Sequence, residues 1–262
     1  EIADGDWSSD VCSSDLDDGW LRTLTIREGK WTGERLVELM TTQSDRVWLE
    51  DGSHSMPSGD IVQWFADWLM DWAEKRGVEL TSVVWTQKRA KRGEPTQWNT
   101  KCVAGEPVFH EELELPGGED SEPERLRFEI GPRAFFQTNT RGAERLYAEV
   151  LERAGVIGAS AERKEWAVDL YCGTGTIALV LANYVESVVG VELREEAVRN
   201  ARQNAADNGM ENVRFVCADV REALAEGDLG REPPLVVVDP PRAGLSERAR
   251  KRLVGLAPER LV

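Results

Sequence analysis

The sequence is poor in cysteine and histidine, with four cysteines and two histidines among 262 residues. The cysteines are far apart and form no Cys-x-x-Cys pair, which excludes a zinc site or a disulfide framework that can be recognised from spacing. They are Cys12, Cys102, Cys172 and Cys217. We therefore predict no metal site and a reducing compartment, the cytoplasm, with an organellar location left open.

Long apolar runs and excess positive charge are also missing. No stretch approaches the roughly 20 apolar residues that a bilayer crossing needs, so we predict no membrane contact. Lys and Arg total 32 against 48 Asp and Glu, a net charge of −16, so most of the surface would repel a phosphate backbone. One dense basic cluster, made of Lys88, Arg89, Lys91 and Arg92, is a candidate RNA contact, although a solvated loop is the favoured interpretation.

Composition and periodicity divide the chain into three parts. Residues 1–18 are polar and acidic, which is typical of a disordered or foreign leader. Residues 19–130 predict a small α+β domain with a helix over 57–76. Trp64, Trp68 and Trp72 in that helix fit packing of the helix better than stacking on bases. Residues 131–262 alternate helices with short apolar strands, the pattern of an α/β domain with a parallel, Rossmann-like sheet.

A glycine turn follows the first apolar strand of the α/β part. The strand Trp166–Leu170 leads into a turn with Gly173 and Gly175, and a helix begins directly afterwards. Two glycines let the backbone approach a ligand, and the helix start offers unpaired N–H groups there. Because any tight strand-to-helix turn also needs glycine, this motif alone leaves a purely structural role equally open.

Four acidic residues stand at the ends of four successive predicted strands: Asp169, Glu192, Asp219 and Asp239. The carboxyl ends of parallel strands meet at one edge of a sheet, where ligands bind. Glu192 follows Asp169 by 23 positions, near the spacing at which an acid holds ribose hydroxyls. Acidic strand ends disfavour a phosphate-rich cofactor and favour S-adenosylmethionine, which carries hydroxyls, an adenine amine and a sulfonium cation.

The motifs in this order resemble those of the RNA uracil-5-methyltransferase family. They are Phe135-Phe136-Gln137-Thr138-Asn139, Asp169-Leu170-Tyr171-Cys172-Gly173-Thr174-Gly175, Gly190-Val191-Glu192, Asn204, Asn208-Gly209 and Asp239-Pro240-Pro241-Arg242-Ala243-Gly244. The resemblance is strong over residues 126–262 and looser over 21–105. Nothing here corresponds to the RNA-binding β-barrel or the iron–sulfur cysteines of some family members.

The resemblance implies a site residue by residue. For S-adenosylmethionine it implies Gln137, Tyr171, Gly173, Gly175, Thr176, Glu192, Asp219 and Asp239, with Glu192 at the ribose and Asp219 at the adenine end. For the flipped uracil it implies Phe136, Gln137, Asp239, Pro240 and Arg242. Phe135 and Phe136 are candidates to support that base, and packing in the core is the commoner role for such a pair.

In the family mechanism, a cysteine thiolate attacks C6 of uracil, and C5 then takes the methyl group from the sulfonium. A glutamate removes the C5 proton, and the cysteine leaves C6 as the thiolate. We expect the nucleophilic cysteine beyond Val262 and the glutamate further on, so the chain as given is expected to be inactive. Cys172 lies inside the glycine turn, and Cys217 lies on a strand whose apolar neighbours would raise its pKa, so neither is expected to replace it.

The resemblance therefore predicts a monomeric enzyme that makes 5-methyluridine in structured tRNA or rRNA. Two alternatives remain. One is a methyltransferase acting on an exocyclic amine of a nucleic-acid base, although such enzymes follow the two prolines with an aromatic residue where Arg242 stands here. The other is a fragment that binds cofactor or RNA without catalysis.

Overall fold

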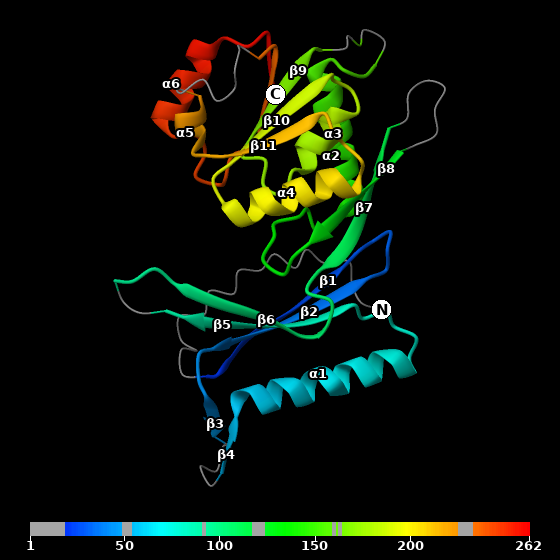
Figure 1. Cartoon of the computed structure of the whole chain (residues 1–262), viewed down its shortest axis with the longest axis vertical. Coiled ribbons are helices and arrows are strands. Elements are labelled where there is room, and N and C mark those ends of the chain that lie inside the picture. The colour runs from blue at the N-terminus through cyan, green and yellow to red at the C-terminus, as the bar shows by residue number, and fades with distance from the viewer. Residues whose placement is uncertain are drawn as a thin grey trace.

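The computed structural model describes residues 19–48, 54–90, 93–116, 124–158, 161, 164–224 and 233–262. The predicted leader over residues 1–18 lies outside these ranges, as do Lys91 and Arg92 of the basic cluster. Figure 1 shows a parallel sheet with its helices in the upper half, a second sheet across the middle, and a long helix below that sheet. No helix in the described part is both long and apolar enough to cross a membrane.

The second sheet, called the central sheet below, has the order β1-β2-β5-β6. Its strands are β1 (Leu21–Glu28), β2 (Arg35–Thr42), β5 (Ser82–Arg89) and β6 (Gln97–Gly105). β2 and β5 are parallel and the other pairs are antiparallel. The crossover between the two parallel strands contains a short hairpin, β3 (Arg46–Trp48) and β4 (Ser55–Pro57), and then helix α1 (Ser58–Lys75). A parallel pair needs such a long connection, and α1 covers one face of the sheet (Figure 1).

Helix α1 forms where the sequence predicts it, but two of its tryptophans do not pack in the core. The helix buries the small residues Val62, Ala66 and Ala73, whereas Trp64 is 67% exposed and Trp68 is 49% exposed. Trp64 and Trp68 are one turn apart, so they share the face opposite the small residues. The predicted packing is therefore wrong for these two. Trp72 is half-buried, and the guanidinium of Arg76 lies 4.7 Å from its ring centroid.

The parallel sheet has the order β11-β10-β9-β12-β13, and every adjacent pair is parallel. Its strands are β9 (Trp166–Leu170), β10 (Ser187–Glu192), β11 (Val213–Cys217), β12 (Leu235–Val238) and β13 (Arg260–Leu261). The helices are α2 (Thr140–Ala154), α3 (Thr176–Ala182), α4 (Glu195–Asp207), α5 (Val220–Ala223) and α6 (Glu247–Leu256). The first strand of this sheet, β9, lies in its middle. The next strands, β10 and β11, are added on one side of β9, and β12 and β13 are then added on the other side, as in Rossmann-like folds.

Both faces of the parallel sheet are buried, which explains why its strands are almost continuously apolar. Ala167 of β9 packs in a core with α2 and α3, while Val168 and Leu170 pack in a second core on the opposite face with α5 and α6. Parallel strands covered by helices on two sides have this pattern. The predicted fold class, a Rossmann-like α/β sheet with a smaller α+β part before it, is confirmed.

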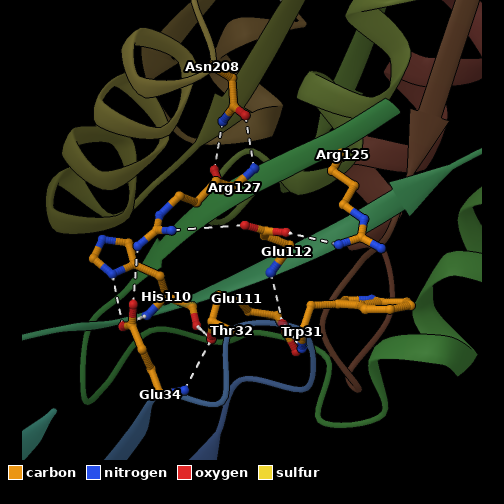
Figure 2. Close-up of polar contacts among 9 residues, drawn as sticks. All are labelled: Trp31, Thr32, Glu34, His110, Glu111, Glu112, Arg125, Arg127 and Asn208. Carbon is orange, nitrogen blue, oxygen red and sulfur yellow. Dashed lines mark hydrogen bonds and ion pairs between the residues drawn. The ribbon is translucent and has the colours of Figure 1, made fainter. Parts of the chain in front are cut away.

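A two-stranded ribbon, β7 (Phe109–Leu115) and β8 (Glu124–Ile130), lies between the two sheets. Its inward residues, including Leu113 and Phe128, share the core of α2 and α3. Asn208 holds β8 through its side-chain amide, which accepts from the Arg127 N–H at 2.9 Å and donates to the Arg127 carbonyl at 2.6 Å (Figure 2). Asn204 accepts from the Glu129 N–H at 2.8 Å. Two asparagines of the sequence motifs thus fasten the ribbon to α4.

The turn between β1 and β2 is fastened to the ribbon by two glutamates, a region called the junction below (Figure 2). Glu111 is 2% exposed and accepts hydrogen bonds from the backbone N–H groups of Lys30 at 2.6 Å and Trp31 at 3.0 Å. Glu34 accepts from the His110 N–H at 2.7 Å and forms an ion pair with Arg127 at 3.1 Å. The central sheet is therefore joined to the ribbon by buried polar contacts.

Candidate cofactor and substrate site

An open pocket lies where the carboxyl ends of β9 and β12 meet. It is lined by residues 135–137, 171–174 and 176–177, with Tyr147, Asp169 and Asp239. These segments come from the approach to α2, the glycine turn after β9 and the turn after β12. The reversal of strand order separates the following loops at this edge, and ligands of such sheets bind there.

The glycine turn is held in place by packing behind it. Gly175 has φ +85°, and a Cβ there would lie 2.9 Å from the Phe215 ring and 3.0 Å from the Ala201 Cβ. Only glycine fits that position. Gly173 also has a positive φ, +55°, but a Cβ there would meet nothing within 4 Å, so its side faces open space. From behind, the Asn204 side chain donates a hydrogen bond to the Thr174 carbonyl at 3.1 Å.

Tyr171 adopts a backbone conformation that is unusual for its residue type. It has φ +67°, in the left-handed region that bulky residues rarely occupy, and it lines the pocket directly after β9. Such a conformation costs on the order of 1–3 kcal/mol and persists where the surroundings over-determine it, most often at binding sites. The turn thus presents Tyr171 to the pocket at an energetic cost.

Asp169 is a fully buried carboxylate at the floor of the pocket. Neither of its oxygens has a hydrogen-bond partner among the described residues. Burial raises the pKa of Asp169 to about 8, and the nearby charges of Asp239 and Glu192 add to that shift. The backbone N–H of Ala178 opposes the shift, although it does not reach hydrogen-bond geometry with either oxygen. An unpaired buried carboxylate is costly, so this site is suited to a ligand that brings a cation or several N–H donors.

Glu192 and Asp219 stand at the ends of the next two strands and are already engaged by the protein. Glu192 accepts from the Gly173 N–H at 3.2 Å and from the Arg194 N–H at 2.8 Å. Asp219 caps α5 and accepts from the Arg221 guanidinium at 2.6 Å, and this hydrogen bond is the main cause that lowers the pKa of Asp219 to about 2. Glu192 therefore borders the pocket through Gly173, and Asp219 lies further along the same edge.

The structure brings together part of the set that the resemblance implied. The pocket is lined by Phe136, Gln137, Tyr171, Gly173, Thr176 and Asp239. Gly175, Glu192, Asp219, Pro240 and Arg242 are not among its lining residues, and Arg242 is exposed in the turn after Asp239. Phe136 packs on Phe128 with ring centroids 5.5 Å apart, whereas Phe135 is 73% exposed at the pocket. Their roles toward a ligand remain predictions.

The sequence placed Asp169 among the acids at the ligand-binding edge without giving it an individual role, and it gave no binding role to Tyr147, although both line the pocket. For Asp169 the sequence did carry a signal. An acid at the end of an apolar strand is expected to be buried, and a buried acid is unusual unless it has a partner. Tyr147 lies on α2, and burial raises the pKa of its hydroxyl, with Asp239 and Asp169 contributing. Its helical spacing marks it only as a core residue, so no sequence signal could have found it.

None of the described cysteines is suited to act as a nucleophile at the pocket. Cys172 lines the pocket, but burial holds the pKa of its thiol well above the ordinary value, with Asp169 adding to the effect. Cys102 lies on β6, and burial also raises the pKa of its thiol. Cys217 is exposed at the end of β11, so the predicted apolar surroundings are wrong for it. It does not line the pocket.

Comparisons with known proteins agree with this architecture. A family model described as a methyltransferase domain matches residues 162–230. An uncharacterized RNA methyltransferase of Protochlamydia amoebophila is 36% identical over 94% of this chain and 53% of its own length. Another, from Caldanaerobacter subterraneus, is 34% identical over 94% of this chain and 47% of its own length. The chain thus spans about half the length of the curated relatives it matches.

Among solved structures, the chain is similar to the Pyrococcus abyssi tRNA (uracil-54, C5)-methyltransferase in complex with S-adenosyl-L-homocysteine. The TM-score is 0.61 and the identity 27%, over 94% of this chain and 50% of that protein. The methyltransferase-domain match also agrees with the predicted cofactor, S-adenosylmethionine. In sequence and in its Rossmann-like fold the chain is similar to RNA methyltransferases, so the resemblance that its motifs indicated is confirmed.

Proposed function

We propose that the pocket binds S-adenosylmethionine and that the protein is an RNA methyltransferase acting on C5 of a uridine. The observation that carries the proposal is the unpaired, fully buried carboxylate of Asp169 beside a glycine turn at the switch point of the sheet. The names of the relatives and of the structural neighbour support RNA, and tRNA in particular, as the substrate.

The residues of the pocket fit this cofactor chemically. The amino group of its methionine part would give Asp169 the cation and N–H donors that the protein does not supply. Asp239 adds a second negative charge near the sulfonium, and Glu192 stands where ribose hydroxyls are expected. When bound, S-adenosylmethionine supplies a methyl group activated by the positive sulfur. The open space beside Gly173 leaves room for close approach to the backbone.

The substrate side is formed by the exposed rim of the same pocket. Phe135 is exposed, and Gln137 and Asp239 bring polar groups that can pair with the edge of a flipped uracil. C5 of uracil becomes nucleophilic only after a thiolate adds to C6, and none of the described cysteines offers a thiolate here. Because none of these cysteines offers a thiolate, we expect residues 1–262 to bind cofactor without turnover, and the position of the nucleophile stays a prediction.

Calorimetric titration of S-adenosylmethionine into the chain tests the cofactor site. Asp239→Asn removes a pocket charge with little change of shape and should weaken binding at least tenfold. Asp207→Asn is the matched control, because Asp207 lies on α4 away from the pocket, where its side chain accepts from Gln203 at 2.7 Å. It should bind like the unchanged chain. A folded chain that binds no cofactor, or equal affinity in all three, would reject the site.

The reaction is tested by incubating the chain and unmodified tRNA with S-adenosylmethionine labelled on its methyl group, followed by nucleoside analysis. Cofactor binding without transfer is the expected result for residues 1–262. If label enters RNA, 5-methyluridine would support C5 chemistry, and the expectation of inactivity would be wrong. N-methylated bases would instead support methylation of an exocyclic amine and overturn the C5 proposal.

A further inference from the structure

We propose that Trp98, Arg133 and Lys88 form a platform that binds the single-stranded nucleotides flanking the base at the pocket. This inference rests on the proposed function, because it assumes that the substrate is RNA. It assigns the recognition of neighbouring nucleotides to the central sheet and to the segment before α2. Lys88 belongs to the basic cluster of the sequence, whereas Trp98 and Arg133 belong to none of its motifs.

The platform consists of one tryptophan between two cations. Trp98 on β6 is 36% exposed and is the direct register partner of Lys88 on β5, whose ammonium lies 5.7 Å from the Trp98 ring centroid. The guanidinium of Arg133 lies 4.6 Å from the same centroid. Aromatic rings and guanidinium planes are the groups on which unpaired bases stack, and both cations can meet phosphates.

The platform is continuous with the mouth of the pocket. Arg133 stands two residues before the exposed Phe135, which lines the pocket. The Arg27 side chain on β1 donates to the carbonyls of Ala134 at 2.9 Å and Gly131 at 3.3 Å, which fixes this segment against the central sheet. Two residues span at most about 7 Å, a length comparable to about two stacked nucleotides. A strand entering the pocket would therefore pass the platform.

Charge distinguishes this platform from the contact between Arg125 and Trp31 at the junction. Within the described ranges, no carboxylate forms an ion pair with Lys88 or Arg133, although the chain has 48 acidic residues. By contrast, Arg125 lies 4.3 Å from the Trp31 ring centroid but also pairs with Glu114 at 3.1 Å. An Arg that is neutralised by a carboxylate attracts phosphate weakly, so the Trp98 site keeps more positive charge available for RNA than the Arg125–Trp31 contact does.

Fluorescence anisotropy with a labelled single-stranded RNA of about a dozen nucleotides tests the platform on the full chain. Arg133→Gln and Lys88→Gln should each weaken RNA binding several-fold, and the pair together at least tenfold. The slope of log affinity against log salt should fall by about one for each phosphate that a variant no longer neutralises. Trp98→Phe, which keeps a stacking face, should bind more tightly than Trp98→Ala. S-adenosylmethionine affinity should not change in any of these variants.

Arg125→Gln is the matched control, since it removes an arginine from a tryptophan face outside the platform, and RNA affinity should change less than twofold. Unchanged RNA affinity and salt slope in the Lys88 and Arg133 variants would overturn the platform and reduce these contacts to a structural role. So would a chain that binds cofactor but no RNA. Neither result touches the cofactor pocket, whose failure would appear separately as absence of S-adenosylmethionine binding.

Discussion

The junction and the pocket each bury one carboxylate, and the protein treats the two in opposite ways. Glu111 at the junction accepts hydrogen bonds from Lys30, Trp31, Glu112 and the Thr140 hydroxyl, so its lone pairs are used by the chain itself. Asp169 at the pocket is equally inaccessible to solvent and has no partner in the described part. A buried charge with donors all around is structural, whereas one without donors marks a place for a ligand.

Because Asp169 is buried without a partner in the described part of the chain, the largest effect that we predict is a dependence of the free energy of unfolding on pH. The folded-state pKa of Asp169 is about 8, and its unfolded value is near 3.9, so between these values the folded chain keeps a proton that the unfolded chain loses. Stability then falls as pH rises, by up to about 1.4 kcal/mol per pH unit, or about 4 kcal/mol from pH 5 to 8. Asp169→Asn should remove this component.

Urea unfolding of the cofactor-free chain and of Asp169→Asn at pH 5, 6, 7 and 8 measures the effect as the difference between the two. The variant should become relatively more stable as pH rises. Cofactor affinity should show the opposite trend, rising up to tenfold from pH 6 to 7 in the unchanged chain, because binding favours ionised Asp169 and releases its proton. Parallel stability curves would mean that Asp169 is not buried as a protonated acid.

Breaking the junction should destabilise the protein without touching the pocket. Glu111→Ala leaves three backbone N–H groups and the Thr140 hydroxyl without their acceptor, at a cost of roughly 3 kcal/mol in the free energy of unfolding. The next residue offers a control: Glu112 is partly exposed and pairs with Arg125 at 3.6 Å (Figure 2), so Glu112→Ala should cost less than about 1 kcal/mol.

Urea unfolding compares the two variants, and calorimetry of the folded fraction should give unchanged S-adenosylmethionine affinity for both. Equal, small decreases in stability would show that the junction is not held by Glu111. A decrease in cofactor affinity in Glu111→Ala would contradict the separation of the two regions, since it would mean that the contacts of the junction also shape the pocket.

The fold of the second half was predictable because four of its strands are largely apolar and have an acid at or just after their carboxyl ends. Asp169, Glu192 and Asp239 follow from counting along the chain, and the parallel register then brings them to one edge. The order of the central sheet was not predictable in the same way. Its parallel β2–β5 pair depends on where α1 packs, and α1 turns its small residues to the sheet and leaves Trp64 and Trp68 outside.

Residues of the pocket could be predicted from the sequence only where they belong to a local motif. Tyr171 and Gly173 belong to the turn and could be located from its motif. Tyr147 reaches the pocket from α2 through tertiary packing, and Arg133, in the segment between β8 and α2, meets Trp98 of the central sheet, so neither contact has a local sequence signal. Glu111 likewise resembles an outward acid of an alternating strand until the β1–β2 turn and α2 close over it.

Asn204 connects the ribbon to the pocket, and its substitution is expected to have the smallest effect of those predicted here. Its fully buried amide accepts from Glu129 in the ribbon and donates to Thr174 in the glycine turn. Asn204→Ala should lower the free energy of unfolding by roughly 2 kcal/mol and weaken S-adenosylmethionine binding several-fold, because the turn loses its support. One helical turn later, Asn208 bonds to the backbone of Arg127 in the ribbon and to the Asn204 carbonyl, and no hydrogen bond links its side chain to the glycine turn within the described residues.

Asn208→Ala should therefore cost about 1 kcal/mol of stability and leave cofactor affinity unchanged. Urea unfolding and calorimetric titration of both variants separate support of the ribbon from support of the pocket. If both asparagines change stability alone, the glycine turn keeps its shape without Asn204, and the packing of Gly175 against Phe215 and Ala201 is then sufficient to hold it. If both weaken binding equally, the ribbon itself is part of the cofactor site.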